Sequence, residues 1–360
     1  MPTTSIAHMP FFQALAGQEE DGPEWNATKA GLLVMRLVDR AWEAPRFGRM
    51  ERWEIAAVAD AVSAVDQGNV VRRLLEQVIV AVSEKGVQAA TVLPRLAAYA
   101  RALEFDAQWT LAADVYTSVV DHALIPEHGD LASSSAWHIG YCLRMAGELG
   151  QATEAYARAR LTAQECGNED DVFRAELGLA AIAMHRGNLP EAEKMLDRVI
   201  AAAAKAQRAE MLSCALHDRA EVAARRGELD ASVVFGHRAL ELCTDPTRRD
   251  RILADVANAL GIMGQHEAAR QAFEVLAVTA QEQHIRWLAL VNLLELAAES
   301  GSETLFEQYR RELTAVELPP SLSGYFHLYV GKGCLRFERY PSAKAAFERA
   351  VAVAQEHSVN

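Results

Sequence analysis

The chain has 360 residues, of which 51% are hydrophobic and 24% charged, and its formal net charge at pH 7 is −13. This composition is typical of a folded chain, and its acidity argues against general binding of nucleic acid or anionic membranes, which requires clustered Lys and Arg. The sequence has no apolar run of membrane-spanning length, no basic and apolar secretory signal, and no C-x2-C pair among its five cysteines. These features predict a cytoplasmic protein with reduced thiols and no metal or cofactor.

Residues 1–25 combine Pro, Gly and the acidic stretch QEEDGPE. Because chain termini of this composition are seldom tied down, we predict a loosely ordered N-terminus. The alternative is that the apolar side chains of Met9, Phe11 and Phe12 dock on the body of the protein.

Residues 26–86 are predicted to form an N-terminal helix followed by a degenerate capping hairpin. An apolar stripe indicates a helix over Lys29–Glu43, with Asn26 or Thr28 as its cap. The hairpin is expected over Glu51–Asp66 and Val70–Ser83. A DNA-binding helix-turn-helix is the weaker interpretation of this hairpin, since its second helix lacks a set of base-reading polar residues.

From residue 87 to residue 360 a skeleton of small and apolar residues recurs every 37 to 40 residues. In the best-defined unit, Gly147 is followed five residues later by Ala152 and nine residues later by Tyr156. A glycine can take positive φ and so turn the chain, and small residues allow two helices to cross closely. A fixed period of this length predicts an array of helical repeats. The turn positions are Ala107, Gly147, Gly187, Gly227, Gly264, Gly301 and Glu338.

The segments MAGELGQATEAYARA and FERYPSAKAAFERAVAVA both contain A-x3-[YF]-x2-A after the turn position. This pattern resembles the tetratricopeptide repeat family, and the unit length is similar to that of bacterial peptide-sensing regulators and kinesin light chains. The resemblance covers roughly residues 87 to 356. It implies an all-α, right-handed superhelical solenoid of about eight antiparallel helix hairpins behind an N-terminal helix. The second helices are expected at residues 107–122, 150–165, 189–205, 229–243, 265–281, 302–315 and 340–356.

Motifs for nucleotide binding, metal-dependent hydrolysis and serine hydrolysis are not found in the sequence, so no catalytic residue is predicted. The resemblance implies a scaffold or adaptor that holds a peptide or partner protein in the concave groove of the solenoid. One alternative is a peptide-sensing regulator whose superhelix changes shape with ligand. Another is a phosphatase-like effector of response regulators, although residues 26–85 do not show the glutamine-containing motif of such proteins.

The concave face is expected to be lined by the first helix of each hairpin. Positions six and three before, and one and four after, the small residue at each helix crossing share one helical face. Four basic side chains face one acidic side chain in this set, which predicts a partner with acidic character. The candidate binding residues are Trp137, Tyr141, Arg144, Arg174, His217, Glu221, Arg251, Asn258, Tyr325 and Lys332.

The C-terminal end lacks the extra helix that covers the last unit in many repeat arrays. Only six residues follow Ala354, so Ala350, Val351 and Val353 are expected to be incompletely covered. We hypothesise that this end packs on a second copy of the chain, as a homodimer, or on a partner. The alternative is that the last hairpin tolerates the exposure.

Overall fold

The computed structural model describes residues 7–43, 52–83, 88–123 and 127–357. Every regular element in these ranges is an α-helix, which confirms the all-α prediction. The chain divides into two compact units, an N-terminal unit of residues 1–187 and a C-terminal unit of residues 188–360. The boundaries expected after residues 25 and 86 stay a prediction.

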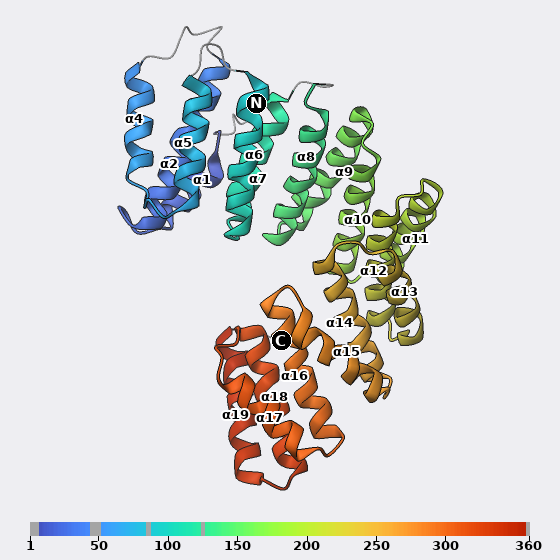
Figure 1. The fold of residues 1–360 in the computed structure, drawn as a ribbon. Coiled ribbons are helices and arrows are strands. Elements are labelled where there is room, and N and C mark those ends of the chain that lie inside the picture. The colour runs from blue at the N-terminus through green and yellow to red at the C-terminus, as the bar shows by residue number, and fades with distance from the viewer. Residues whose placement is uncertain (1–6, 44–51, 84–87, 124–126, 358–360) are drawn as a thin grey trace. The chain divides into compact units, whose positions relative to one another are not determined.

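The helices follow one another along the chain with short connections (Figure 1), and in chain order α4 to α19 make up the eight successive helix pairs that the repeat pattern predicts. The N-terminal unit contains α1 (Met9–Ala16), α2 (Pro23–Trp42), α4 (Arg52–Ser63), α5 (Val70–Ser83), α6 (Ala89–Phe105), α7 (Trp109–His122), α8 (Gly129–Met145), α9 (Leu149–Cys166) and α10 (Glu169–His185). The C-terminal unit contains α11 (Leu189–Lys205), α12 (Ala209–Arg225), α13 (Leu229–Leu242), α14 (Pro246–Ile262), α15 (His266–Thr279), α16 (Gln283–Glu299), α17 (Glu303–Thr314), α18 (Pro320–Arg336) and α19 (Tyr340–His357).

The turn positions that the sequence identified all have left-handed backbone. All five turn glycines have φ between 73° (Gly187) and 82° (Gly147). The two positions where glycine is replaced keep the same conformation, with φ of 57° at Ala107 and 59° at Glu338. The repeat therefore fixes the backbone conformation even where the residue is unfavourable for it.

Close helix crossings depend on glycine in the first helices. A Cβ atom added at Gly140 would lie 2.6 Å from Tyr156 Cδ1, and one added at Gly178 would lie 2.4 Å from Tyr156 Cε1. The buried Tyr156 ring of α9 therefore packs against glycines of both α8 and α10. Gly331 and Phe347 repeat this contact between α18 and α19, with a Cβ-to-ring distance of 2.5 Å.

Residues 7–25 differ from the loosely ordered segment expected from their composition, and residues 1–6 of that segment lie outside the described residues. Phe11 of α1 is fully buried in the core that α2, α5, α6 and α7 share. His8 caps the same helix and contacts Asp39 of α2 and Asp114 of α7. Of the three apolar residues that the alternative expected to dock on the body of the protein, Phe11 does so. Met9 and Phe12 are each 37% exposed.

Helix α2 begins six residues earlier than predicted. Its first residue is Pro23, which suits a helix start because proline has no N–H to leave unpaired and its φ is already helical. Neither Asn26 nor Thr28 caps the helix: Asn26 donates from its side chain to the Asp21 carbonyl oxygen, and Thr28 is buried.

Within each unit, the first helices of successive pairs pack on one another. In the N-terminal unit α8 contacts both α6 and α10, and in the C-terminal unit α14 contacts α12 and α16, and α16 contacts α18. The second helices do not make comparable contacts with each other in the described part of either unit. The surfaces formed by these first helices are here called the first-helix faces.

The last helix, α19, leaves apolar residues accessible, as the sequence indicated. Val351 is 55% exposed, and Ala350 and Val353 are half-buried. Across the described residues, no helix combines the length and apolar character required to cross a membrane.

Candidate functional site

The accessible positions of the first helices are partly different from those that the repeat register predicted. Asp255 on α14 is exposed and Asn292 on α16 is half-buried, whereas the preceding residues, Ala254 and Val291, are buried. In α14 the position two before the crossing residue therefore faces outward, whereas the prediction used the position three before it. For α16 the prediction named no crossing residue. Polar residues recur at the omitted position, and this was the signal that could have revealed it: His138, Asp218, Asp255, Asn292 and Tyr329.

The ten predicted binding residues are all at least partly accessible. Four of them lie in the N-terminal unit and six in the C-terminal unit. The structure brings together two local groups, one around Trp137 in the N-terminal unit and one around Asn258 in the C-terminal unit.

The group in the N-terminal unit is an aromatic cluster on α8. The Trp137 and Tyr141 rings stack, with centroids 5.4 Å apart and planes 20° apart, and Trp109 of α7 meets Tyr141 edge-on. The Arg144 guanidinium lies 5.4 Å from the Tyr141 ring centre. This arrangement offers a half-buried aromatic surface with one cation beside it, suited to an apolar or aromatic side chain of a partner.

Two residues of this group also hold α8 and α10 together. Trp137 donates from its indole N–H to the Arg174 carbonyl oxygen at 3.0 Å. The Arg174 guanidinium pairs with Asp171 at 2.7 Å, and the buried Asp171 carboxylate also accepts a hydrogen bond from Ser133. Trp137 and Arg174 are therefore structural residues of the repeat as well as candidates for binding.

The group in the C-terminal unit lines a pocket of about 380 Å³ on the first-helix face. The pocket is formed mainly by α14, α16 and α18, with Phe273 of α15 at its wall. Its polar residues are Asn258, Asn292, Glu295, Glu299 and Tyr329. The sequence identified only Asn258 among them.

Two side-chain amides in this pocket have donor or acceptor groups that form no hydrogen bond with the described residues. Asn292 donates to the Leu288 carbonyl oxygen at 2.9 Å, which leaves its own amide oxygen as an acceptor. The Asn258 side chain has no hydrogen-bond partner within the described residues. Since an amide carries both donors and an acceptor, each can pair with a peptide group of a ligand.

Glu295 connects α16 to α18 at the edge of the pocket. Lys332 donates to its carboxylate at 2.6 Å and lies 5.0 Å from the Tyr329 ring centre. Burial, together with the charge of Glu295 and a hydrogen bond to it, raises the pKa of Tyr329 well above its usual value. With its proton shared with Glu295, the Tyr329 hydroxyl can still accept a hydrogen bond from a ligand.

The excess of basic side chains expected on this face is offset by acids outside the predicted set. Arg251 pairs with Glu282 at 2.6 Å, and Lys332 pairs with Glu295. His217 contacts Asp255 at 2.8 Å, and although burial acts to lower the pKa of His217, the hydrogen bond and charge of Asp255 raise it overall. The four bases and one acid of the predicted set therefore do not describe the charge of this face by themselves, because Glu282, Glu295 and Asp255 lie beside its bases.

The remaining predicted residues are more peripheral. Glu221 forms an ion pair with Arg225 one turn along α12. Tyr325 is 47% exposed, and its ring centre lies 6.1 Å from that of Tyr329. Among the described residues, no cluster of three or more His, Cys, Asp or Glu side chains is arranged to hold a metal ion.

Helix pairs with left-handed turns, small residues at the crossings and a regular period define the class: the chain has a fold of tetratricopeptide-like helical hairpins. The quorum sensor NprR from B. thuringiensis, solved in its apo form, has this fold, with a TM-score of 0.58, 12% identity and coverage of 95% of this chain and 91% of that chain. The chain is also similar to the Rap conjugation gene regulator of plasmid pLS20 in complex with the Phr* peptide, with a TM-score of 0.55, 11% identity and coverage of 91% and 95%.

A third similar structure is a Rap protein complexed with competence and sporulation factor, with a TM-score of 0.52, 11% identity and coverage of 92% of this chain and 98% of that chain. At this level of identity the likeness concerns the fold. No family model and no curated protein sequence matches the chain.

Proposed function

We propose that the chain is a non-catalytic protein–protein interaction module that binds a peptide, or a peptide segment of a partner protein, on its first-helix faces. The observation that carries this proposal is the pair of accessible amides, Asn258 and Asn292, on neighbouring helices in one pocket of about 380 Å³. Amides so placed can pair with the N–H and C=O groups of an extended peptide whatever its side chains. The aromatic cluster around Trp137 and Tyr141 supplies a second, apolar place of contact.

The similar structures support this proposal. Two of them, the Rap regulator of pLS20 and the Rap protein with competence and sporulation factor, were solved with a peptide or factor bound. The fold that they share with this chain therefore accommodates ligands of this kind. Because NprR is a quorum sensor, a ligand-responsive regulator is favoured over a passive adaptor.

The preference for acidic partners is proposed for the N-terminal unit only. Arg144 lies beside the aromatic cluster, and its guanidinium contacts the His185 ring nitrogen at 3.4 Å. Because His185 carries no negative charge, this contact does not neutralise the positive charge of Arg144. In the C-terminal unit the bases are paired with carboxylates, so recognition there depends on amides and the Tyr329 hydroxyl more than on charge.

The proposal is tested by selecting binders from a library of random peptides displayed on phage, with the full chain as bait. Affinities of the selected peptides are then measured by calorimetry for the natural chain and for Asn258→Ala combined with Asn292→Ala. Loss of two hydrogen bonds predicts a decrease in affinity of about tenfold or more. Gln164→Ala, which removes an exposed amide from α9, is the control and should bind as the natural chain does. Full affinity in the double variant, or no selected binder at all, would contradict the proposal.

The same peptides distinguish a regulator from an adaptor. A ligand-responsive regulator should change its radius of gyration in small-angle X-ray scattering when the selected peptide is added. An adaptor should keep the same radius at saturating peptide.

We also propose that the C-terminal end forms a homodimer through α19. The 55% exposure of Val351 and the accessible Ala350 and Val353 support an apolar contact at this place. Val351→Glu should convert a dimer to a monomer in light scattering, with Val80→Glu on α5, 59% exposed, as the control. A monomer in the natural chain at tens of micromolar would exclude the dimer. The five free cysteines support the proposed location in the cytoplasm.

A further inference from the structure

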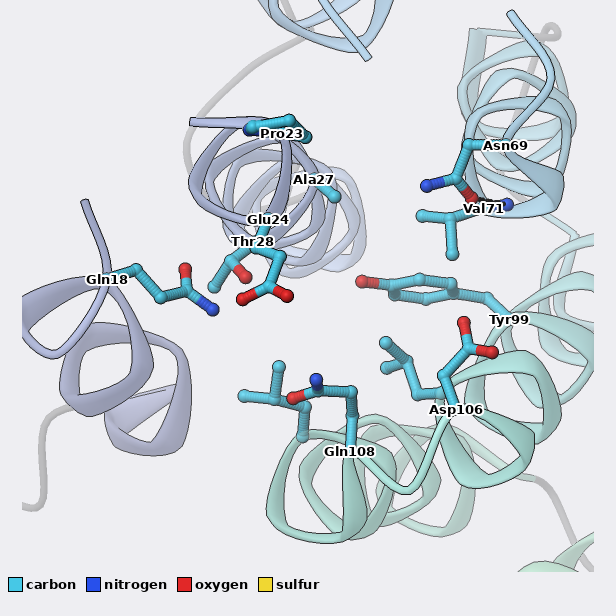
Figure 2. Close-up of a pocket in the computed structure, with 12 residues that line it drawn as sticks. Gln18, Pro23, Glu24, Ala27, Thr28, Asn69, Val71, Tyr99, Asp106 and Gln108 are labelled. Carbon is cyan, nitrogen blue, oxygen red and sulfur yellow. Dashed lines mark hydrogen bonds between the residues drawn. The ribbon is translucent and has the colours of Figure 1, made fainter. Parts of the chain in front are cut away.

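A second pocket, of about 300 Å³, lies in the N-terminal unit and is separate from the first-helix residues discussed above. Figure 2 shows its walls: the start of α2, the start of α5, the α6 helix with the turn that follows it, and Gln18 between α1 and α2. All of its lining residues belong to the part of the chain that precedes α8. The pocket is therefore formed by the non-repeating N-terminal helices where they meet the first regular hairpin.

Two hydroxyl groups of nearly buried side chains open into this pocket without partners. Tyr99 is 1% exposed and points its hydroxyl toward the start of α2, and Thr28 on α2 is 7% exposed. Neither hydroxyl forms a hydrogen bond with another described residue. The Gln18 amide oxygen is also buried without a partner. A buried polar atom without a partner costs free energy, so a ligand that donates to the Gln18 oxygen, and to the two hydroxyls beside it, would be stabilised here.

The charged residues that line the pocket are all acidic. Glu24 and Asp106 bring carboxylates from opposite walls, and none of the lining residues is Lys, Arg or His. The hydroxyls and the amides of the lining can both donate and accept, so the two carboxylates set the sign of the ligand. A ligand that complements them is positively charged and carries several N–H donors.

We propose that this pocket binds a small organic cation bearing a guanidinium or primary ammonium group. The cation lies between the Glu24 and Asp106 carboxylates and donates hydrogen bonds to them. Its remaining N–H groups donate to the Tyr99 and Thr28 hydroxyl oxygens and to the Gln18 amide oxygen. A ligand in this place contacts α1–α2, α5 and α6 together, so its binding stabilises the N-terminal unit.

The test is calorimetric titration of the full chain with agmatine, which carries a guanidinium and a primary ammonium, and with 1,4-butanediol as a neutral molecule of related length. We expect saturable binding of agmatine that weakens with salt, a rise in melting temperature, and no binding of butanediol. Asp106→Asn and Glu24→Gln should each weaken agmatine binding about tenfold or more, because each removes a charge-assisted bond. Tyr99→Phe keeps the buried ring and should weaken binding severalfold.

Glu20→Gln is the matched control, since Glu20 is an exposed acid four residues from Glu24 that does not line the pocket. Its agmatine affinity should equal that of the natural chain. The proposal is overturned if agmatine does not bind at millimolar concentrations, if butanediol binds equally well, or if the combined Glu24→Gln and Asp106→Asn variant keeps full affinity. Circular dichroism melts of each variant establish that the N-terminal unit remains folded.

Discussion

The N-terminal helices α1 and α2 and the regular hairpins are held by different kinds of contact. In the hairpins, a ring of the second helix packs against a glycine of the first helix, as Tyr156 does against Gly140 in α8 and α9 and Phe347 does against Gly331 in α18 and α19. The position of α1 depends on contacts that occur once: the buried Phe11 ring, and His8, which bonds to Asp39 at 2.9 Å and to Asp114 at 2.6 Å. Repeated contacts can be identified from sequence spacing, whereas single contacts between distant residues leave no periodic signal.

Among the contacts that occur once, the burial of the Phe11 ring should have the largest effect on the free energy of unfolding. Phe11→Ala leaves a cavity in the shared core, and we expect a loss of about 3–5 kcal/mol in the free energy of unfolding, measured by urea titration. The neighbouring Phe12, 37% exposed, provides a control of the same residue type. Phe12→Ala should cost less than about 1 kcal/mol. Equal effects of the two changes would mean that α1 is not docked through Phe11.

The His8 contact should give the N-terminal helices a dependence on pH. Burial acts to lower the pKa of His8, but hydrogen bonds and charges from Asp114 and Asp39 outweigh it and raise the pKa from 6.5 to about 9. A group with a raised pKa in the folded state contributes its full stabilisation below the unfolded value of 6.5. That contribution declines as pH rises through 9, and the whole difference corresponds to about 3 kcal/mol.

The measurement is the difference in unfolding free energy between the natural chain and His8→Gln at several pH values. Taking this difference removes the titration of groups that both proteins share. It should be largest at pH 6 and should have nearly vanished at pH 10. A difference that is constant across this range would show that His8 is not charged in the folded protein.

These two kinds of contact also explain what the sequence could and could not predict. The turns at Gly147 and Ala107 and the crossing of Gly140 with Tyr156 followed from the period alone, since each relation is repeated. The docking of Phe11 was considered only as an alternative, because its partners lie on helices that come later in the chain. The outward face of α14 was placed partly wrongly: a shift of one residue along a helix rotates a side chain by about 100°, enough to replace the exposed Asp255 with the buried Ala254. Asn292 was missed for another reason, because no crossing residue was predicted in α16.

The repeated contacts can be tested at Gly178. Gly178→Ala places a Cβ atom 2.4 Å from the buried Tyr156 ring, which has no room to move away. We expect a loss of about 1–3 kcal/mol in the free energy of unfolding from this overpacking. Gly150→Ala is the control: Gly150 lies in the first turn of α9, with no atom within 4 Å of the added Cβ, and the change should be neutral or slightly stabilising. Tyr156→Leu in the Gly178→Ala background should recover part of the loss if the ring is its cause.

The smallest effect is expected where the repeat carries a residue that does not suit its turn. Ala107 has φ of 57°, a conformation that costs an L-residue with a Cβ about 1–2 kcal/mol relative to the right-handed one. Ala107→Gly removes this strain but increases the entropy of the unfolded chain by about 0.5–1 kcal/mol. The net result should be a gain of up to about 1 kcal/mol in the free energy of unfolding. Ala157→Gly, inside α9, relieves no strain and only increases the entropy of the unfolded chain. It should lower the free energy of unfolding by about 1 kcal/mol. Opposite signs for the same substitution, measured in parallel urea titrations, would show that the turn conformation is imposed by the repeat; a loss at both positions would show that it is not.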